Sequence, residues 1–256
     1  MPYVENNKVK IYYETEGKGP PLMLHSGWSG TIQNYHDNGY TKPLRKKYQL
    51  ILIDPRGHGK STKLYTPESY RFETLVKDTT TILDELNIEK SNFMGYSFGG
   101  RVALAIPKYA PDRFKSLIIG GAAAIELDSS EDVRRREATN NRVRQGIEPL
   151  IQLMVNAGIP RPEATRRAEN TDWEAMVALN MNDEHQRFEE YLPSCKIPCL
   201  FFAGDTDSRY SEVIRTAGLI ENAVFVSQPG LNHGQSFRQS QTVIEHIQDF
   251  LAKHNR

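Results

Sequence analysis

The hexapeptide Gly95-Tyr96-Ser97-Phe98-Gly99-Gly100 is the stretch of sequence that decides the fold. A short apolar run, Asn92-Phe93-Met94, precedes it and is typical of a buried strand, whereas residues 99–109 carry apolar side chains at helical spacing. A serine between glycines at such a junction lies on a tight turn that exposes its hydroxyl above the sheet. The glycines suit the close backbone contacts and unusual dihedral angles of this turn. The hexapeptide therefore predicts a nucleophilic Ser97 with the positive end of a helix behind it.

Strand-length and helix-length patterns alternate on both sides of this turn. The other strand-like runs cover residues 9–14, 21–24, 48–53, 116–119, 199–203 and 223–226, and further helical patterns cover residues 73–86 and 241–254. Most of these runs are apolar without alternation, as in strands that are covered on both faces. Strands that alternate with helices pair in parallel through right-handed crossovers. We therefore expect an α/β fold with a mostly parallel central sheet and helices on both faces.

The alternation stops between residues 124 and 193, where the pattern is helical and strand signals are lacking. Gly146 and the segment Gly158-Ile159-Pro160 break this stretch into two to five short helices. An insert at this point suits a cap over the carboxyl ends of the strands, where ligands bind in open α/β sheets. We therefore expect a core domain made of residues 1–123 and 194–256 and a small helical cap made of residues 124–193.

Charge and cysteine content exclude several classes of protein. Lys and Arg together number 32, as do Asp and Glu, so the chain lacks the basic excess of a nucleic-acid binder. Acidic residues surround the densest basic stretch, Arg134-Arg135-Arg136, which is typical of a solvated helix face. Three residues separate Cys195 from Cys199, whereas a redox pair needs two, and no matching His or Cys pair completes a metal site. We expect both cysteines to be small buried side chains.

The sequence also carries no targeting signal that we recognise. The N-terminus lacks a basic segment followed by an apolar one, and no run of about 18 apolar residues exists. We therefore expect a cytoplasmic protein that does not contact a membrane. The sequence does not fix the oligomeric state, and we expect a monomer or a homodimer.

Four further motifs, taken in order with the turn at Ser97, make the chain resemble the α/β-hydrolase superfamily over nearly its whole length. Leu-Met-Leu-His-Ser-Gly-Trp at 22–28 is similar to the family's oxyanion loop, and Asp-Pro-Arg-Gly-His-Gly-Lys-Ser at 54–61 to the loop after its fourth strand. Gly-Asp-Thr-Asp at 204–207 follows a late strand, and Asn-His-Gly at 232–234 lies near the end. The order nucleophile, acid, histidine matches the family. The resemblance implies an α/β-hydrolase fold.

The resemblance implies a catalytic triad of Ser97, Asp207 and His233. A serine hydroxyl is a poor nucleophile at neutral pH and needs a base, for which His233 lies in a suitable polar loop before the last helix. The family pattern of a glycine, two residues and then the aspartate selects Asp207, which would orient His233 and stabilise the imidazolium. Asp205 remains the alternative acid; otherwise we expect it to brace the loop.

The oxyanion hole is expected to use two backbone N–H groups, one of them from Phe98. The other comes from the loop after His25, where Ser26 replaces the glycine of the commonest family pattern. Counting two residues on from His25 gives Gly27, which we favour, whereas sliding the glycine into register gives Trp28. The aromatic side chains beside these positions are candidates for an apolar acyl pocket, with ordinary packing as the equal alternative: Trp28, Tyr96 and Phe98.

Two other groups of residues are expected to support the structure rather than the reaction. Asp54, Arg56 and His58 should brace their own loop. Apolar side chains at helical spacing in the insert could face the pocket, but packing in the core is favoured: Leu150, Leu153, Met154, Trp173, Met176, Leu179 and Met181.

The resemblance implies a serine hydrolase of the carboxylesterase kind. Related families with an aspartate in place of Ser97, the haloalkane dehalogenases and epoxide hydrolases, are disfavoured. We expect hydrolysis of a small carboxylic ester or lactone through an acyl-enzyme, with a small molecule as partner and with no metal or cofactor. The alternatives keep the fold but change the chemistry, to C–C bond hydrolysis, thioester cleavage or cofactor-free haloperoxidase or perhydrolase activity, or use the cavity as a small-molecule receptor.

Overall fold

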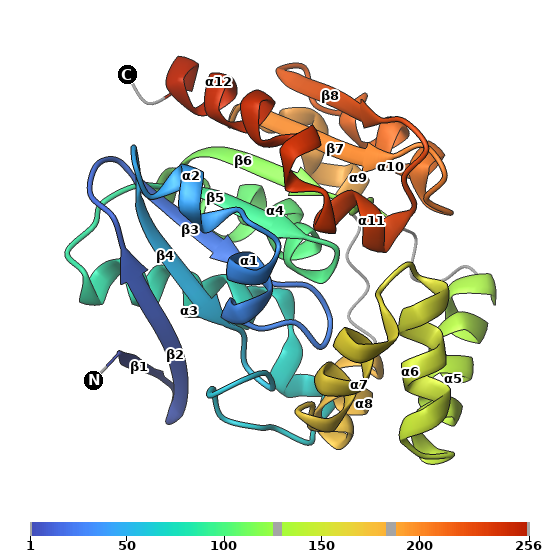
Figure 1. The fold of residues 1–256 in the computed structure, drawn as a ribbon. Coiled ribbons are helices and arrows are strands. Elements are labelled where there is room, and N and C mark those ends of the chain that lie inside the picture. Colours follow the sequence, from blue (N-terminus) through green and yellow to red (C-terminus); the bar gives the residue numbers. More distant parts are fainter. Residues whose placement is uncertain (1, 125–129, 183–187, 255–256) are drawn as a thin grey trace.

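The computed structural model describes residues 2–124, 130–182 and 188–254, and its centre is an eight-stranded sheet (Figure 1). The strands lie in the order β1-β2-β4-β3-β5-β6-β7-β8. All neighbours from β4 to β8 pair in parallel, whereas β1 pairs antiparallel with β2, and β2 with β4. Their bounds are β1 Tyr3–Asn6, β2 Val9–Glu16, β3 Pro21–His25, β4 Gln49–Asp54, β5 Ser91–Tyr96, β6 Phe114–Gly120, β7 Cys199–Gly204 and β8 Ala223–Gln228. The expected mostly parallel α/β sheet is confirmed, with β1 added to it.

The central strands are buried on both faces, which explains why their apolar runs do not alternate with polar residues. All six residues of β5 and of β7 are buried. Because successive side chains point to opposite faces, Leu22 and Leu24 pack in one core cluster and Met23 packs in the other. The sheet therefore separates two apolar layers, each of which needs its own cover of helices.

Helices supply this cover on both faces (Figure 1). One layer contains side chains of α3 (Phe72–Glu85), α4 (Phe98–Tyr109), α9 (Phe188–Tyr191) and α10 (Tyr210–Ala217). The opposite layer contains side chains of α1 (Ile32–Asp37), α2 (Thr41–Leu44), α11 (His233–Arg238) and α12 (Ile244–His254). Short 3₁₀ turns lie at Pro67–Tyr70, Pro111–Arg113, Leu192–Ser194 and Ser240–Thr242. The three helical patterns found in the sequence correspond to α3, α4 and α12.

The insert between β6 and β7 is helical where the structure describes it. It contains α5 (Ser130–Arg144), α6 (Ile147–Asn156), α7 (Arg161–Glu169) and α8 (Trp173–Asn180), which lie together beside the sheet in Figure 1. Gly146, with φ of 107°, separates α5 from α6, as its position in the sequence suggested. Residues 125–129 and 183–187, near the predicted ends of the cap, lie outside the described residues. The division at 124 and 193 therefore stays a prediction, and Phe188 and Leu192 pack with the core layer of α3 and α4.

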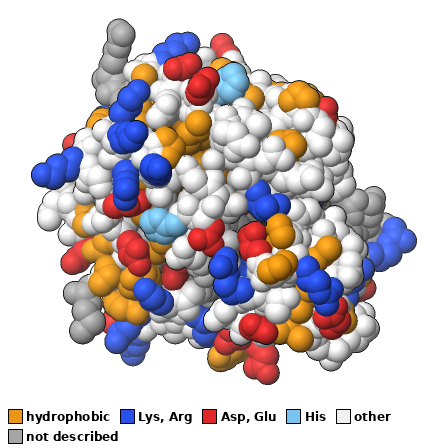
Figure 2. Space-filling model, viewed as in Figure 1, with side chains coloured by type: hydrophobic (Ala, Val, Ile, Leu, Met, Phe, Trp, Pro, Cys, Tyr) orange, Lys and Arg blue, Asp and Glu red, His pale blue; other side chains and the backbone are white. Residues whose placement is uncertain are grey.

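The surface shows no segregation of charge on the face drawn in Figure 2, where Lys and Arg side chains are mixed with Asp and Glu. Among residues 2–124, 130–182 and 188–254, no helix has the length and apolar character needed to cross a membrane. Cys195 and Cys199 are both buried, as expected, and both are free thiols.

Candidate active site

The turn between β5 and α4 holds Ser97 in a strained backbone conformation, with φ of 55° and ψ of −112°. The neighbouring glycines leave no room for side chains. A Cβ atom on Gly95 would lie 2.1 Å from the carbonyl oxygen of Gly99, and one on Gly99 would lie 2.2 Å from that of His25. The glycines therefore allow the turn to close against β3 and to present the Ser97 hydroxyl at the carboxyl ends of the strands.

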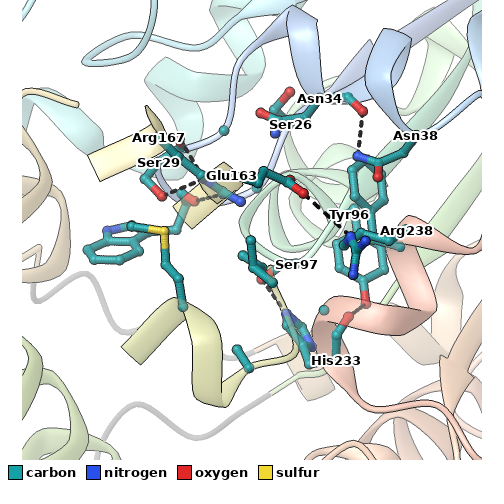
Figure 3. Close-up of a pocket in the computed structure, with 18 of the residues that line it drawn as sticks. Ser26, Ser29, Asn34, Asn38, Tyr96, Ser97, Glu163, Arg167, His233 and Arg238 are labelled. Atoms are coloured by element: carbon teal, nitrogen blue, oxygen red, sulfur yellow. Dashed lines mark hydrogen bonds and ion pairs between the residues drawn. The ribbon is translucent and has the colours of Figure 1, made fainter. Parts of the chain in front are cut away.

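A chain of hydrogen bonds joins three side chains that are far apart in the sequence. His233 Nε2 lies 3.0 Å from Ser97 Oγ, and His233 Nδ1 lies 2.6 Å from Asp207 Oδ2 (Figure 3 draws the first contact). A carboxylate only accepts hydrogen bonds, so Nδ1 carries the proton and Nε2 can accept from the Ser97 hydroxyl. This is the arrangement that a general base needs in order to activate a serine.

The two partners of Ser97 are held by their local structure. His233 begins α11, and the side chain of Asn232 caps this helix by accepting from the backbone N–H of Gln235 at 3.0 Å. The Asp207 side chain is 1% exposed. Burial raises the pKa of Asp207, but the hydrogen bond and charge of His233 and the backbone N–H of Arg209 lower it more, so the net pKa is below its ordinary value. Asp207 thus stays ionised beside His233 at neutral pH.

Asp205, the alternative acid, is used differently. Its Oδ1 accepts a hydrogen bond from the backbone N–H of Gly230 at 2.7 Å. This contact braces the turn after β7 against the loop that leads to His233. Of the two aspartates, the structure brings Asp207 to the histidine.

The loop after β3 runs directly past Ser97. A Cβ atom on Gly27 would lie 3.3 Å from Ser97 Cβ and 3.9 Å from the backbone nitrogen of Phe98. Phe98 is the first residue of α4, so its N–H has no acceptor within the helix. Among the described residues, no acceptor is found for the N–H groups of Gly27, Trp28 or Phe98. Backbone N–H donors from the loop after β3 and from the start of α4, the two segments expected to form the oxyanion hole, therefore lie close to Ser97.

Two buried histidines, His25 and His58, contact the backbone of this loop. His25 Nδ1 donates to the carbonyl oxygen of Ser26 at 3.0 Å. The backbone N–H of Ser29, a residue with φ of 55°, donates to His58 Nε2 at 3.1 Å, and His58 Nδ1 donates to the carbonyl oxygen of Arg56 at 2.9 Å. The Arg56 guanidinium makes a two-pronged ion pair with Asp78. Asp54 accepts from the backbone N–H of Ile32 at 2.9 Å. Arg56 thus fixes its own loop to α3, whereas His58 and Asp54 reach the segment after β3, so all three have a structural role, as expected.

The buried histidines lead to a prediction about stability. Burial lowers the pKa of His25 to about 4 and that of His58 to about 3. Between pH 6.5 and pH 4, both histidines are therefore protonated in the unfolded chain but stay neutral in the folded protein. Stability is present above pH 6.5 and is lost as pH falls, by about 1.4 kcal/mol per pH unit for each histidine. Urea unfolding at a series of pH values from 7 to 4.5 measures this slope.

A His58→Gln variant provides the comparison for this prediction. It removes one of the two titrating groups, so the slope of the unfolding free energy against pH should be smaller than that of the parent protein by about 1.4 kcal/mol per pH unit. Burial raises the pKa of Asp54 and of Asp78, so protonation of these two carboxyl groups stabilises the folded protein as pH falls. This contribution is the same in both proteins and cancels when their slopes are compared. An unchanged slope in the variant would refute the assignment to buried neutral histidines.

Two cavities meet at Ser97, His233 and Trp28. The first, of about 170 Å³, is also lined by Gly27 and Tyr96 together with polar side chains (Figure 3). The second, of about 410 Å³, is also lined by Phe98. The three aromatic residues expected at the pocket therefore line it: Trp28 both cavities, Tyr96 the first and Phe98 the second. Tyr96 is nevertheless largely a packing residue, since it is buried and its hydroxyl donates to the carbonyl oxygen of His233 at 2.5 Å.

The apolar residues of the insert divide between the cavities and the packing of the insert. Leu153 lines both cavities, Met154 the first and Leu179 the second. Met176 packs in an apolar cluster with Tyr70, and the partly buried Trp173 packs against it. The first cavity also contains charged and amide side chains that sequence reasoning did not select: Asn34, Asn38, Glu163, Arg167 and Arg238.

The insert contacts both loops that carry the site. On the side of the β3 loop, Arg167 of α7 donates to the carbonyl oxygens of Trp28 and Ser29 at 2.5 and 3.0 Å. On the side of the histidine loop, the backbone N–H of Gly234 donates to the carbonyl oxygen of Ala157 at 2.8 Å. Helices from the insert thus help to fix the backbone on either side of Ser97.

Comparison with known proteins relates the chain to one family of folds. A family model described as alpha/beta hydrolase fold matches residues 20–209. The chain is 21% identical over 272 residues to the bifunctional esterase/perhydrolase DCH of Acinetobacter calcoaceticus, a match that covers 95% of this chain and 96% of that protein. It is 36% identical over 108 residues to 3-oxoadipate enol-lactonase 1 of Acinetobacter baylyi, covering 41% of this chain and 38% of the lactonase. The chain thus spans less than half the length of that curated relative.

Among solved structures, the enol-lactonase from Burkholderia xenovorans LB400 superposes with a TM-score of 0.86. The two chains are 21% identical, and the match covers 98% of this chain and all of the other. At this identity the likeness establishes the fold.

Proposed function

The chain belongs to the α/β hydrolase fold family, and from this premise we propose that it hydrolyses a small carboxylic ester or lactone through an acyl-enzyme on Ser97. The observation that carries the proposal is the hydrogen-bonded chain from Ser97 through His233 to Asp207. A serine with this histidine–aspartate pair suits acyl transfer. Similarity to an esterase/perhydrolase over most of the chain, and to an enol-lactonase over part of it, supports the substrate class.

The reaction proceeds in two halves. In the first, His233 Nε2 takes the proton of the Ser97 hydroxyl as the oxygen attacks the substrate carbonyl carbon, and His233 then gives that proton to the departing alcohol or enol oxygen. In the second, His233 takes a proton from water, the resulting hydroxide attacks the acyl carbon, and Ser97 recovers its proton as the acid is released. Asp207 keeps the ring of His233 in the required tautomer and stabilises the imidazolium.

The negative oxygen of each tetrahedral intermediate is stabilised by the backbone N–H groups of Phe98 and Gly27. Gly27 is preferred to Trp28 because its Cα lies against Ser97, as the short distance from its hypothetical Cβ to Ser97 Cβ indicates. The N-terminus of α4 adds its partial positive charge at the same point. Only backbone groups contribute to this site, so Ser26 does not disturb it.

The two cavities suit the two parts of an ester or lactone. Because both are lined by Ser97 and His233, a carbonyl carbon at Ser97 has room on one side for the acyl chain and on the other for the leaving oxygen. A lactone, in which these two parts are joined, would occupy both cavities at once. The first cavity, at about 170 Å³, is smaller than the roughly 300–1,000 Å³ of a drug-sized pocket, so the part of the substrate that it holds should be short.

The proposal is tested by active-site labelling together with a series of substrates. An alkyl fluorophosphonate should react with one residue per chain, and mass spectrometry should place the adduct on the peptide that contains Ser97. Hydrolysis of p-nitrophenyl esters from acetate to octanoate should be fastest for the short acyl chains and should stop when labelling is complete. Heat-unfolded protein serves as the control. Turnover that persists in the fully labelled enzyme would refute the acyl-enzyme on Ser97.

A second candidate activity, perhydrolysis, follows from the same acyl-enzyme. It is favoured by the esterase/perhydrolase relative, which matches this chain over nearly its full length. Hydrogen peroxide in place of water in the second half of the reaction would release a peracid. Peracid formation from acetate ester and peroxide, followed by oxidation of a dye, distinguishes this activity from simple hydrolysis.

A further inference from the structure

The cavity of about 170 Å³ beside Ser97 contains an arginine that the proposed reaction does not use. Arg167 projects from α7, and Figure 3 shows its guanidinium group between Ser29 and the interior of the cavity. Its Nε donates to the carbonyl oxygen and to the hydroxyl of Ser29, both at 3.0 Å, and its Nη2 donates to the carbonyl oxygen of Trp28 at 2.5 Å. These three bonds fix the plane of the guanidinium before any substrate arrives.

The third guanidinium nitrogen, Nη1 of Arg167, has no hydrogen-bond partner among the described residues. The acceptors that hold Arg167 are a hydroxyl and two carbonyl groups, which carry no charge. Burial lowers the pKa of Arg167 to about 10, which the charge of Glu163 partly offsets, so the group remains a cation at neutral pH. A partly buried cation with a free donor is costly unless an acceptor of negative charge completes it.

The other charged groups of the cavity do not supply that acceptor. Glu163 is one turn away on the same helix, but its Oε2 lies 3.5 Å from Nε of Arg238 in an ion pair. Figure 3 shows Glu163 directed toward Arg238. With two arginines and one glutamate, these side chains give the cavity a net charge of +1. The excess positive charge therefore resides at Arg167.

The remaining walls suit a short carbon chain that ends in a polar group. Asn34 and Asn38 add amide groups to the polar side of the cavity. The apolar side is formed by Leu153, Met154, Ile159 and Phe237. A guanidinium group binds carboxylates in its own plane with charge-assisted hydrogen bonds, and its fixed orientation keeps the entropic cost low.

We propose that this cavity binds a carboxylate group of the substrate through Arg167, so that the preferred substrates are esters or lactones that carry a free carboxylate. The proposal rests on the serine hydrolase function proposed above. It adds the class of compound: a monoester of a short dicarboxylic acid, or a lactone with a carboxylate side chain. The carboxylate lies at Arg167 while the carbonyl carbon to be attacked lies at Ser97.

The kinetic test uses two pairs of substrates of matched size. One pair carries the charge on the acyl side, p-nitrophenyl hydrogen glutarate against p-nitrophenyl pentanoate. The other carries it on the leaving group, 3-carboxyphenyl acetate against phenyl acetate. In at least one pair the charged member should have a kcat/KM about 10- to 100-fold above the neutral one, since a hydrogen bond to a charged group contributes roughly 1.5–3 kcal/mol. Absence of a preference in both pairs would overturn the proposal.

Variants of Arg167 separate recognition of charge from support of the loop. Arg167→Gln loses the contacts to Trp28 and Ser29 as well as the charge, so it lowers turnover of neutral and charged esters alike, but the preference for the charged member should disappear. Arg167→Lys keeps the charge and should retain part of the preference. Arg166→Gln is the matched control, because Arg166 is the exposed neighbour on α7 that pairs with Asp37, and its preference should equal that of the parent. An Arg167→Gln variant that keeps the full preference would overturn the proposal.

A binding measurement makes the test independent of catalysis. Isothermal titration calorimetry with glutarate, on the Ser97→Ala protein, should detect binding that is lost when Arg167→Gln is added. If neutral esters are hydrolysed but neither charge preference nor glutarate binding is found, the carboxylate proposal fails and the hydrolase function stands. If no ester is hydrolysed but glutarate still binds through Arg167, the hydrolase function fails and the carboxylate site stands.

Discussion

Replacement of Ser97 by alanine is expected to lower kcat/KM for p-nitrophenyl acetate by roughly 10⁴- to 10⁶-fold. The change removes the oxygen that lies 3.0 Å from His233 Nε2 and with it the covalent intermediate. The backbone donors and the cavities remain, so a small residual rate above that of water should persist. Because alanine adopts the same strained dihedral angles as serine at this turn, thermal unfolding should occur within a few degrees of the parent temperature.

The matched control for this variant is Ser194→Ala, which removes an exposed hydroxyl that donates to the carbonyl oxygen of Tyr191 far from the cavities. It should keep the parent rate. Initial rates at several substrate concentrations, on protein whose fold is checked by circular dichroism, give the comparison. If the Ser97→Ala protein keeps more than about one hundredth of the parent kcat/KM, another group is the nucleophile or another mechanism operates.

Replacement of Arg56 by methionine should destabilise the folded protein by about 3–5 kcal/mol. Arg56 and Asp78 form a two-pronged ion pair with both distances at 2.6 Å, and each side chain is 3% exposed. The variant leaves the Asp78 carboxylate buried with Asn6 as its remaining polar partner. Burial already raises the pKa of Asp78, so part of the cost will appear as uptake of a proton. Urea unfolding at pH 7 measures the change.

Two further variants give this prediction its controls. In Arg56→Met with Asp78→Leu, no buried charge is left unpaired, so at least half of the lost stability should return. In Arg45→Met, the pair broken is the exposed one with Glu16, and the change should stay below about 1 kcal/mol. A single Arg56→Met variant that costs no more than Arg45→Met would contradict the view that the buried pair holds the loop after β4 against α3.

The parts of the molecule that sequence reasoning reached are those encoded by local chemistry. The strand before Ser97 and the helix after it follow from apolar runs and glycines that lie within about a dozen residues of one another. The choice of Asp207 over Asp205 came instead from the family pattern that the chain resembles, and in the structure the turn after β7 points Asp205 at Gly230 and Asp207 at His233. Antiparallel pairing of β1 with β2 was not expected, since four residues at the start of the chain give too short a pattern.

Arg167 could not be selected from the sequence because its role depends on a contact with a distant segment. It lies on α7, a polar helix that also carries Arg161 and Arg166, and nothing in the local sequence sets one of these three arginines apart from the others. Only the placement of α7 over residues 28–29 distinguishes the arginine that lines the cavity from its neighbour on the surface. Periodicity indicates which face of a helix is apolar, but not which polar residue will meet a loop 138 residues earlier.

The attachment of the insert to both catalytic loops has a consequence for how selectivity can change in this protein. A transplanted insert that lacks a donor for Trp28 and Ser29 and an acceptor for Gly234 would leave both loops without the contacts that Arg167 and Ala157 now make. Such a hybrid would have a new substrate specificity, but the backbone on either side of Ser97 would also be less firmly held. Turnover rate and selectivity would therefore change together. Single replacements on the inner faces of α6 and α8 leave the contacts of Arg167 and Ala157 intact. They are therefore the route to a change in selectivity without a change in turnover.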